Sequence, residues 1–210
     1  MTDPILVLGA GGHGKVVADC ALSCGLVVTG FLDDAVRPGI EVLGIPVIGA
    51  LSELPRLRAA ASTVVVAIGD GATRVNLIDL ARSIGLRTPA LVHPSATVSR
   101  FAIINEGTVV LAQAAINAGA QIGRGVIVNT AATVDHDCIV GDGAHVCPGA
   151  HLAGSVRIGR FSWIGIGSSV KQGTVIGSNA TIGAGAAVVA DVADGVTAAG
   201  VPAHPVRTRI

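Results

Sequence analysis

The chain has 210 residues, enough for one large domain or two modest ones. Its 14 basic and 14 acidic residues give a formal net charge of zero, and no run of one sign would attract a nucleic acid or a membrane surface. Half of the residues are hydrophobic, but no stretch of about 18 apolar residues could span a bilayer. The chain also begins without the basic segment and cleavage site of a secretion signal, so we expect a cytoplasmic protein.

The first predicted element is a short apolar strand over residues 5–8, and residues 15–24 read as a helix. Between them lies Gly-Ala-Gly-Gly-His-Gly, a GxGxxG pattern in the strand-to-helix context that it requires. Gly11, Gly12 and Gly14 let the backbone approach a phosphate, which the helix N-terminus would favour electrostatically. The pattern predicts a nucleotide site. The alternatives are a purely structural turn or an NAD site, although nothing downstream supplies a hydride-transfer centre.

Two further strands are predicted at residues 27–32 and 64–68. The first ends at Asp33 and Asp34 and the second at Gly69. If the three strands are parallel, their carboxyl ends share one edge of a sheet, where such folds place ligands. The two carboxylates, about 20 residues past the glycines, could accept hydrogen bonds from a ribose or a base. We therefore predict a small Rossmann-like nucleotide-binding domain over residues 1–92.

A repeat governs the rest of the chain. From Val98 to Val188 an aliphatic residue recurs at every sixth position, sixteen times without exception, and the residue four positions later is small or β-branched. A six-residue period is typical of parallel β-helices, in which three hexads form one triangular coil. The pattern predicts about five coils without a projecting loop, in a domain over residues 93–210 that includes a C-terminal tail.

Three of the six histidines lie within sixteen residues of one another, and His136 stands between Asp135 and Asp137. A neutral imidazole is a suitable base for acyl transfer to an amine, and a carboxylate on its other nitrogen would orient it. His145 follows nine residues later, half of one coil, so the two histidines should point to opposite sides of the prism. They can serve one reaction only if neighbouring chains supply them.

The hexads resemble those of the hexapeptide-repeat acyltransferases, left-handed β-helices that assemble as trimers and use acyl-CoA or acyl-carrier donors. With Gly-x-Gly-Gly-His-Gly and Phe-Leu-Asp-Asp ahead of the hexads, the chain resembles one bacterial branch over almost its whole length. That branch comprises nucleotide-sugar N-acetyltransferases that make N-acetylated 4-amino-4,6-dideoxy sugars, and the related sialic acid O-acetyltransferases.

The resemblance implies a homotrimer with acetyl-CoA as co-substrate and active sites between subunits. His136 would be the general base, oriented by Asp137, and the nucleotide-linked amino sugar would be held near the loop histidine. The implied sugar-binding residues are Gly11, Gly12, His13, Gly14, Asp33, Asp34, Gly69 and Asn129.

The same resemblance implies that CoA lies in a groove between two β-helices and is gripped mainly by backbone atoms. The matching positions are His145, Gly154, Ile166 and Ala184, with the N–H of Gly154 facing the thioester oxygen. The family often has glycine where this chain has Ala184. Lys171, Arg207 and Arg209 could meet the phosphates of CoA.

Other readings remain open at this stage. Three nearby histidines could bind zinc as in the γ-class carbonic anhydrases, but that would leave the N-terminal domain without a purpose, so we expect no metal. The reaction could instead be O-acetylation of a sialic acid-like sugar, or the protein could be a non-catalytic nucleotide-sugar scaffold. The sequence does not reveal whether the nucleotide is UDP, GDP or CMP.

Overall fold

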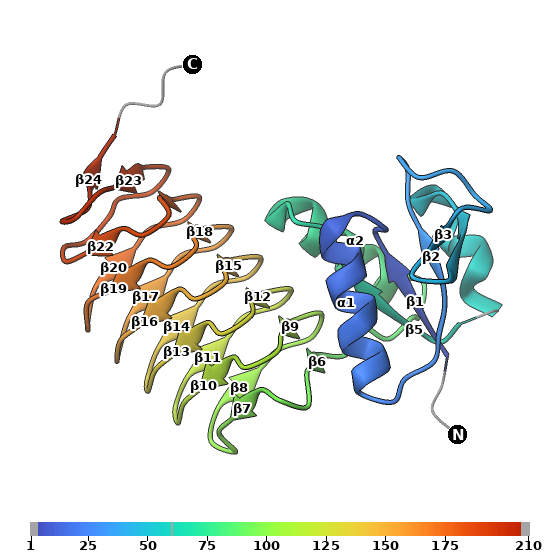
Figure 1. Cartoon of the computed structure of the whole chain (residues 1–210), viewed down its shortest axis with the longest axis horizontal. Coiled ribbons are helices and arrows are strands. Elements are labelled where there is room, and N and C mark those ends of the chain that lie inside the picture. The colour runs from blue at the N-terminus through green and yellow to red at the C-terminus, as the bar shows by residue number, and fades with distance from the viewer. Residues whose placement is uncertain (1–3, 60, 207–210) are drawn as a thin grey trace.

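The computed structural model describes residues 4–59 and 61–206. An N-terminal α/β domain lies beside a long parallel β-helix (Figure 1). The N-terminal sheet has the strand order β3-β4-β2-β1-β5, and β1 runs parallel to β2 and β5. Its elements are β1 (Ile5–Leu8), α1 (Gly12–Ser23), β2 (Val28–Leu32), β3 (Glu41–Val42), β4 (Ile45–Gly49), the 3-10 helix η1 (Leu51–Ala59), β5 (Thr63–Val66) and α2 (Gly71–Ser83).

The three predicted strands are confirmed, and their carboxyl ends meet at one edge of the sheet. Helix α1 begins at Gly12 rather than at residue 15, so His13 and Gly14 lie in its first turn. The β3–β4 pair, η1 and α2 were not predicted. The two α-helices have 12 and 13 residues, and no helix in the described ranges has the length and hydrophobicity of a membrane span.

The β-helix is built from two-residue strands that pair in parallel with strands 18 residues away, as in Ala115 with Thr133. The predicted hexads and their three-sided coils are confirmed. We name the three sheets after a central strand. The β13 sheet contains β7 (Thr97–Val98), β10 (Ala115–Ile116), β13 (Thr133–Val134), β16 (His151–Leu152), β19 (Ser169–Val170) and β22 (Ala187–Val188).

The β14 sheet contains β8 (Ile103–Ile104), β11 (Gln121–Ile122), β14 (Ile139–Val140), β17 (Arg157–Ile158) and β20 (Val175–Ile176). The β15 sheet contains β6 (Leu91–Val92), β9 (Val109–Val110), β12 (Ile127–Val128), β15 (His145–Val146), β18 (Trp163–Ile164), β21 (Thr181–Ile182), β23 (Thr197–Ala199) and β24 (His204–Pro205). Strand β24 is antiparallel to β23.

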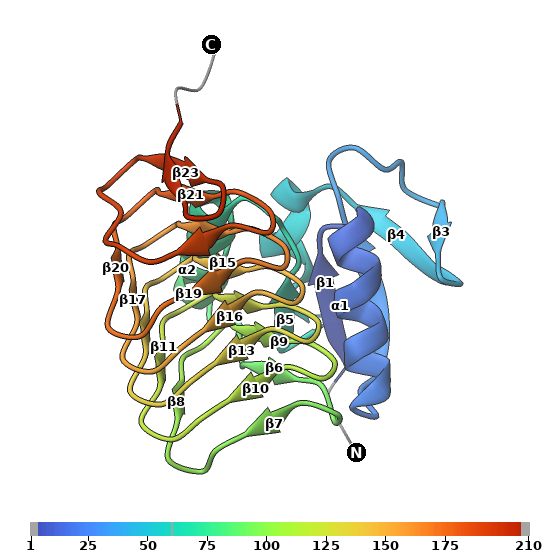
Figure 2. The same ribbon diagram turned by 60° about the vertical axis from the view of Figure 1, so that its left-hand side comes forward.

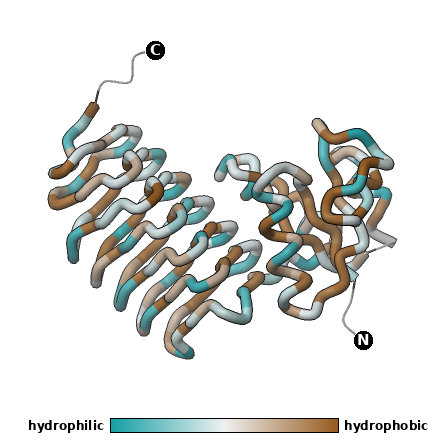
Figure 3. Tube along the Cα trace, viewed as in Figure 1, coloured by the Kyte–Doolittle hydropathy of each residue, from teal (hydrophilic) through white to brown (hydrophobic). Residues whose placement is uncertain are grey.

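The interior of the β-helix is filled by the repeated aliphatic and small side chains. Val134, Val140 and Val146, from the three sides of one coil, are at most 1% exposed, and so is Ala132 at a small-residue position. Burial of apolar surface stabilises a fold by about 25 cal/mol per Å², so a narrow prism without aromatic residues in its core can still be stable. Hydrophobic segments recur along the coils in Figure 3.

The N-terminal domain packs on the outer face of the β15 sheet, where Val109 and Leu111 share a buried cluster with Val7 and Val17. Figure 2 shows α1 standing beside the coils. Helix α2 packs along the corners between the β14 and β15 sheets. Its Ile78 lies so close to the corner at Gly125 that a Cβ on this glycine would be 2.7 Å from Cδ1 of Ile78. The glycine-rich loop is therefore held against the β-helix.

Candidate active site

A cleft of about 430 Å³ opens on the outer face of the β15 sheet, beyond the region that the N-terminal domain covers. Three of the four residues predicted to contact CoA line it, namely His145, Ile166 and Ala184. Gly154 does not line it. The remaining lining residues are Asn129, Cys147, Pro148, Trp163, Gly165, Thr181, Ile182 and Gly183.

His145 forms the inner end of this cleft and is only 8% exposed. Its Nε2 lies 2.9 Å from the side-chain amide nitrogen of Asn129, and its ring meets the ring of Trp163 edge-on, with centroids 4.3 Å apart. Burial, with the positive charge of Arg74 as a smaller cause, lowers the pKa of His145 to about 3. His145 is therefore neutral at physiological pH.

His13, in the first turn of α1, faces His145 across the domain boundary, with ring centroids 6.4 Å apart. Burial and then the charge of Arg74 lower the pKa of His13 to about 4. Nε2 of His13 and Nδ1 of His145 are buried and have no hydrogen-bond partner among the described residues. The loop that was predicted to hold the nucleotide sugar thus reaches the cleft that was predicted to hold the donor.

The glycines of the N-terminal domain fall into two groups. A Cβ at Gly11, Gly12 or Gly69 would meet no atom within 4 Å, so these positions border open space. A Cβ at Gly14 would instead collide with the backbone carbonyl of Gly9, so this glycine allows α1 to pack closely on the loop. A ligand approaching the loop would meet the first group.

The acidic pair after β2 is engaged with the backbone. The Asp33 carboxylate accepts hydrogen bonds from the N–H groups of Ala10, Ala35 and Val36 at 2.6–2.8 Å, and Asp34 accepts one from Leu51 at 2.9 Å. Asp33 therefore ties the glycine-rich loop to the segment after β2. Its predicted contact with a ribose or base stays a prediction.

His136 lies at the corner between the β13 and β14 sheets, and its side chain is 59% exposed. Its Nδ1 is 2.9 Å from Oδ2 of Asp137. This hydrogen bond, followed by the charge of Asp135, raises the pKa of His136 above its ordinary value. Asp135 is held in place because it accepts hydrogen bonds from the side chain of Asn117 and the backbone N–H of His136.

Gly154 lies one coil beyond His136, and a Cβ there would collide with Nε2 of the imidazole. The predicted stacking of these two positions is confirmed. The β15 sheet, which carries His145, lies across the prism from the His136 corner, so the two histidines point to opposite sides as predicted. Within one chain, the candidate base and the candidate donor cleft are separate.

Comparisons with known proteins fit this arrangement. Residues 4–80 match the model of the PglD N-terminal domain, and residues 155–190 match that of the bacterial transferase hexapeptide (six repeats). The acetyltransferase domain of PglB from Neisseria gonorrhoeae FA1090, solved with acetyl coenzyme A, is 46% identical, with a TM-score of 0.93 over 98% of this chain and 100% of that chain. The chain belongs to the bacterial hexapeptide-repeat sugar N-acetyltransferases.

Two further structures place the chain within this family. Perosamine N-acetyltransferase from Caulobacter crescentus, solved as a histidine variant with CoA and GDP-perosamine, is 41% identical, with a TM-score of 0.94 over 98% of this chain and 97% of that chain. WeeI from Acinetobacter baumannii AYE is 28% identical, with a TM-score of 0.88 over 96% and 99% of the two chains. A member of this family is a sugar acetyltransferase with a left-handed β-helix.

Two residues near the site of this family member were not singled out by sequence reasoning. Trp163 could have been found, because it lies 18 positions after His145 and therefore stacks beside it. Arg74 could not, because its contacts depend on how the two domains meet. Arg207 and Arg209 lie outside the described residues. No group of three or more His, Cys, Asp or Glu side chains within residues 4–59 and 61–206 could hold a metal ion.

Proposed function

We propose that the protein transfers the acetyl group of acetyl-CoA to the amino group of a nucleotide-linked 4-amino-4,6-dideoxy sugar, with His136 as general base. The observation that carries the proposal is the hydrogen bond between Nδ1 of His136 and Asp137, with the imidazole packed against Gly154, which has no side chain to displace it. The relatives solved with acetyl coenzyme A and with GDP-perosamine support both substrate classes.

In the proposed reaction, the amine nitrogen of the sugar attacks the acetyl carbonyl carbon of acetyl-CoA, while Nε2 of His136 accepts a proton from this amine. The N–C bond forms, the C–S bond breaks, and CoA leaves as the thiolate. Asp137 holds the imidazole in the tautomer with the proton on Nδ1 and stabilises the imidazolium that forms. We expect direct transfer without an acyl-cysteine, since the thiol of Cys147, which lines the cleft, is kept protonated by burial, which raises its pKa to about 12.

Gly154 is suited to stabilise the negative charge that develops on the acetyl oxygen. It lies against His136, and its N–H donates to no protein group among the described residues. An oxyanion donor of this kind contributes about 3 to 4 kcal/mol to transition-state stabilisation. The same backbone N–H would therefore both bind the donor and lower the barrier.

A homotrimer supplies what one chain lacks. Since His136 and the donor cleft lie on different sides of the prism, the proposed reaction needs the His136 corner of one copy at the cleft of another. The β13 sheet is the one face that connects the His136 corner with the corner bearing Asn129 and Ile166. In a closed three-fold ring that joins these corners, the β13 sheets face the axis.

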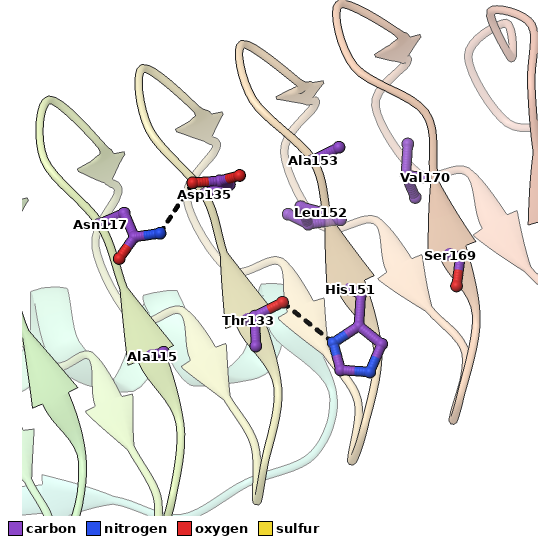
Figure 4. A pocket seen from close by; sticks show the side chains of 9 residues that line it. All are labelled: Ala115, Asn117, Thr133, Asp135, His151, Leu152, Ala153, Ser169 and Val170. Carbon is purple, nitrogen blue, oxygen red and sulfur yellow. Dashed lines mark hydrogen bonds between the residues drawn. The ribbon is translucent and has the colours of Figure 1, made fainter.

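The outer face of the β13 sheet suits such an interface because its side chains are small. Its outward residues include Ala115, Thr133 and Ser169, with His151 bonded through Nδ1 to the hydroxyl of Thr133 at 2.9 Å (Figure 4). The face is hollowed by a pocket of about 390 Å³. Small side chains and a hollow allow the close approach of two further copies.

The test is a thiol-release assay with acetyl-CoA and a panel of UDP-, GDP- and CMP-linked sugars that carry either an amino or a hydroxyl group at the acceptor position. We expect turnover with an amino sugar and loss of turnover in His136→Ala, with the oligomer intact. Near wild-type turnover in His136→Ala would remove the base, and turnover with hydroxy sugars alone would favour O-acetylation. Absence of thiol release together with nucleotide-sugar binding would favour the scaffold.

A further inference from the structure

Arg74 is completely buried between the two domains, in the first turns of α2. A guanidinium group has five N–H donors in a fixed planar arrangement. All five are used here, and every acceptor is a backbone carbonyl. Because the guanidinium fork is planar and pre-organised, this full set of hydrogen bonds fixes where the group lies.

The acceptors come from both domains. Nη1 donates to Ile68 and Gly69 at 2.6 and 2.9 Å, at the carboxyl end of β5. Nε donates to Gly125 at 2.5 Å, and Nη2 donates to Gly143 at 2.8 Å and to Ala144 at 3.4 Å. These last three carbonyls lie at corners of two successive coils, and Ala144 directly precedes His145. Arg74 thus joins the nucleotide-binding edge to the backbone of the donor cleft.

Within residues 4–59 and 61–206, no carboxylate forms an ion pair with Arg74. Asp70 acts on it only from a distance, and its side chain caps α2 by accepting a hydrogen bond from Thr73. A buried cation is costly to desolvate, and a well-packed apolar residue often stabilises a fold at least as well. Stability alone therefore does not account for an arginine here.

We propose that Arg74 is a positioning residue of the transfer reaction, which holds His13 of the glycine-rich loop and His145 of the donor cleft at a fixed separation. The part concerning the reaction rests on the proposed function, whereas the geometric part does not. By this means the sugar held by one domain and the acyl donor held by the other meet in a constant geometry. A misplacement of about 1 Å can lower a rate on the order of 10²-fold.

Arg74→Lys is the first test, because lysine keeps the charge but loses the five-donor fork. We expect kcat to fall on the order of 10²-fold, with the KM for acetyl-CoA within about threefold of the wild-type value. The matched control is Arg82→Met on the same helix, which removes a salt bridge to Glu106 across the same domain boundary at 2.9 Å. The control should keep wild-type kcat.

Trp163, the single tryptophan of the chain, gives a test that needs no activity. Its fluorescence should fall when the adjacent His145 becomes charged. The charged or titratable groups that act on His145 are Arg74 from α2 and His13 from α1, and both lower its pKa. Titrated from pH 8 to pH 3, the wild type and Arg74→Lys should keep a constant emission down to pH 5 and lose it only toward pH 3, because the pKa of His145 is about 3.

In Arg74→Met, by contrast, the quenching midpoint should rise by about one pH unit or more above the wild-type value of about 3, so quenching should be well advanced at pH 4, and His145→Asn in that background should abolish it. Wild-type kcat in Arg74→Lys, an equal loss in Arg82→Met, or an unchanged profile in Arg74→Met would overturn the proposal. If the wild type released no thiol with any acceptor, the proposed function would fail, while the fluorescence arm would still test the placement of Arg74.

Discussion

The side-chain amide of Asn129 donates a hydrogen bond to Nε2 of His145 over 2.9 Å. The amide is oriented by its own oxygen, which accepts a hydrogen bond from the N–H of Thr130 at 2.8 Å. Nε2 of His145 is therefore an acceptor, and the neutral ring carries its proton on Nδ1, on the buried side. Within the cleft, Nε2 of His145 is therefore already engaged by Asn129 when acetyl-CoA binds.

Removing this amide should weaken both the fold and the cleft. In Asn129→Leu a buried acceptor loses its partner, which costs about 1 to 3 kcal/mol of unfolding free energy, and the KM for acetyl-CoA should rise because His145 is free to turn. Urea unfolding and steady-state kinetics measure the two effects. Asn105→Leu is the control, because it also loses a side-chain hydrogen bond, to Ile122, but far from the cleft. An unchanged KM in Asn129→Leu would contradict this assignment.

The pH dependence of turnover should report the contact between His136 and Asp137. Because that hydrogen bond raises the pKa of His136 and only the neutral imidazole can accept a proton, kcat/KM should rise with pH through a pKa above 6.5. In Asp137→Asn the acidic limb should move to lower pH, while the plateau falls on the order of 10²-fold. An Asp137→Asn profile that keeps the wild-type limb would show that another group titrates.

Asp135→Asn serves as the comparison for that profile. The charge of Asp135 also raises the pKa of His136, but its carboxylate bonds to Asn117 and to a backbone N–H rather than to the ring. Asp135→Asn should therefore also move the acidic limb of the kcat/KM profile to lower pH, but with a smaller loss of kcat/KM at the plateau than Asp137→Asn.

Much of this architecture could be predicted because it is local and periodic. An aliphatic residue at every sixth position determines the coil, and the coil determines that Gly154 stacks on His136 while His145 points away. The strand ends and the glycine-rich loop were likewise found from short patterns. Each of these features depends on residues at most one coil apart in the sequence.

The relative placement of the two domains could not be predicted. That His13 approaches His145 to 6.4 Å follows from the packing of α1 and α2 on the β-helix, which no local pattern encodes. The sequence also placed Asp33 at the ligand edge, but it did not predict that the carboxylate accepts hydrogen bonds from three backbone N–H groups. The sequence pattern of an acidic residue after a strand is the same whether its carboxylate contacts a ligand or binds the backbone of the neighbouring loop.

Gly154→Ala should impair catalysis without unfolding the β-helix. The new Cβ would collide with Nε2 of His136 and turn the ring, whereas the corner itself accepts a Cβ, because Ala118 occupies the corresponding position two coils earlier. We expect kcat to fall on the order of 10²-fold with little change in the melting temperature. Adding Gly154→Ala to His136→Ala should cause only a small further loss, and independent, multiplicative losses would show that the two residues act separately.

Thr133→Arg should break the trimer. The added side chain would stand on the face of small residues that we place toward the three-fold axis (Figure 4), and burying an unpaired charge there is costly. Light scattering after gel filtration should give monomers with normal secondary structure and without transferase activity. Gln121→Arg, on the exposed β14 sheet, is the control and should remain trimeric. An active, trimeric Thr133→Arg protein would place the interface elsewhere.

The partly buried His13 and the buried His145 should make the fold sensitive to acid. Folding lowers the pKa of His13 to about 4 and that of His145 to about 3, so below pH 6.5 the unfolded chain binds more protons than the folded one. The unfolding free energy should therefore be complete above pH 6.5 and fall toward pH 4, by up to roughly 2 kcal/mol for each histidine at pH 5. His136, whose pKa is raised, acts in the opposite direction, but its side chain is exposed and it is present in all the proteins compared.

The measurement is urea unfolding at pH 7.5 and at pH 5, at one protein concentration. The loss of unfolding free energy between the two pH values should be smaller in His13→Gln and in His145→Gln than in the wild type. Equal differences in all three proteins would mean that neither ring is kept neutral by the fold.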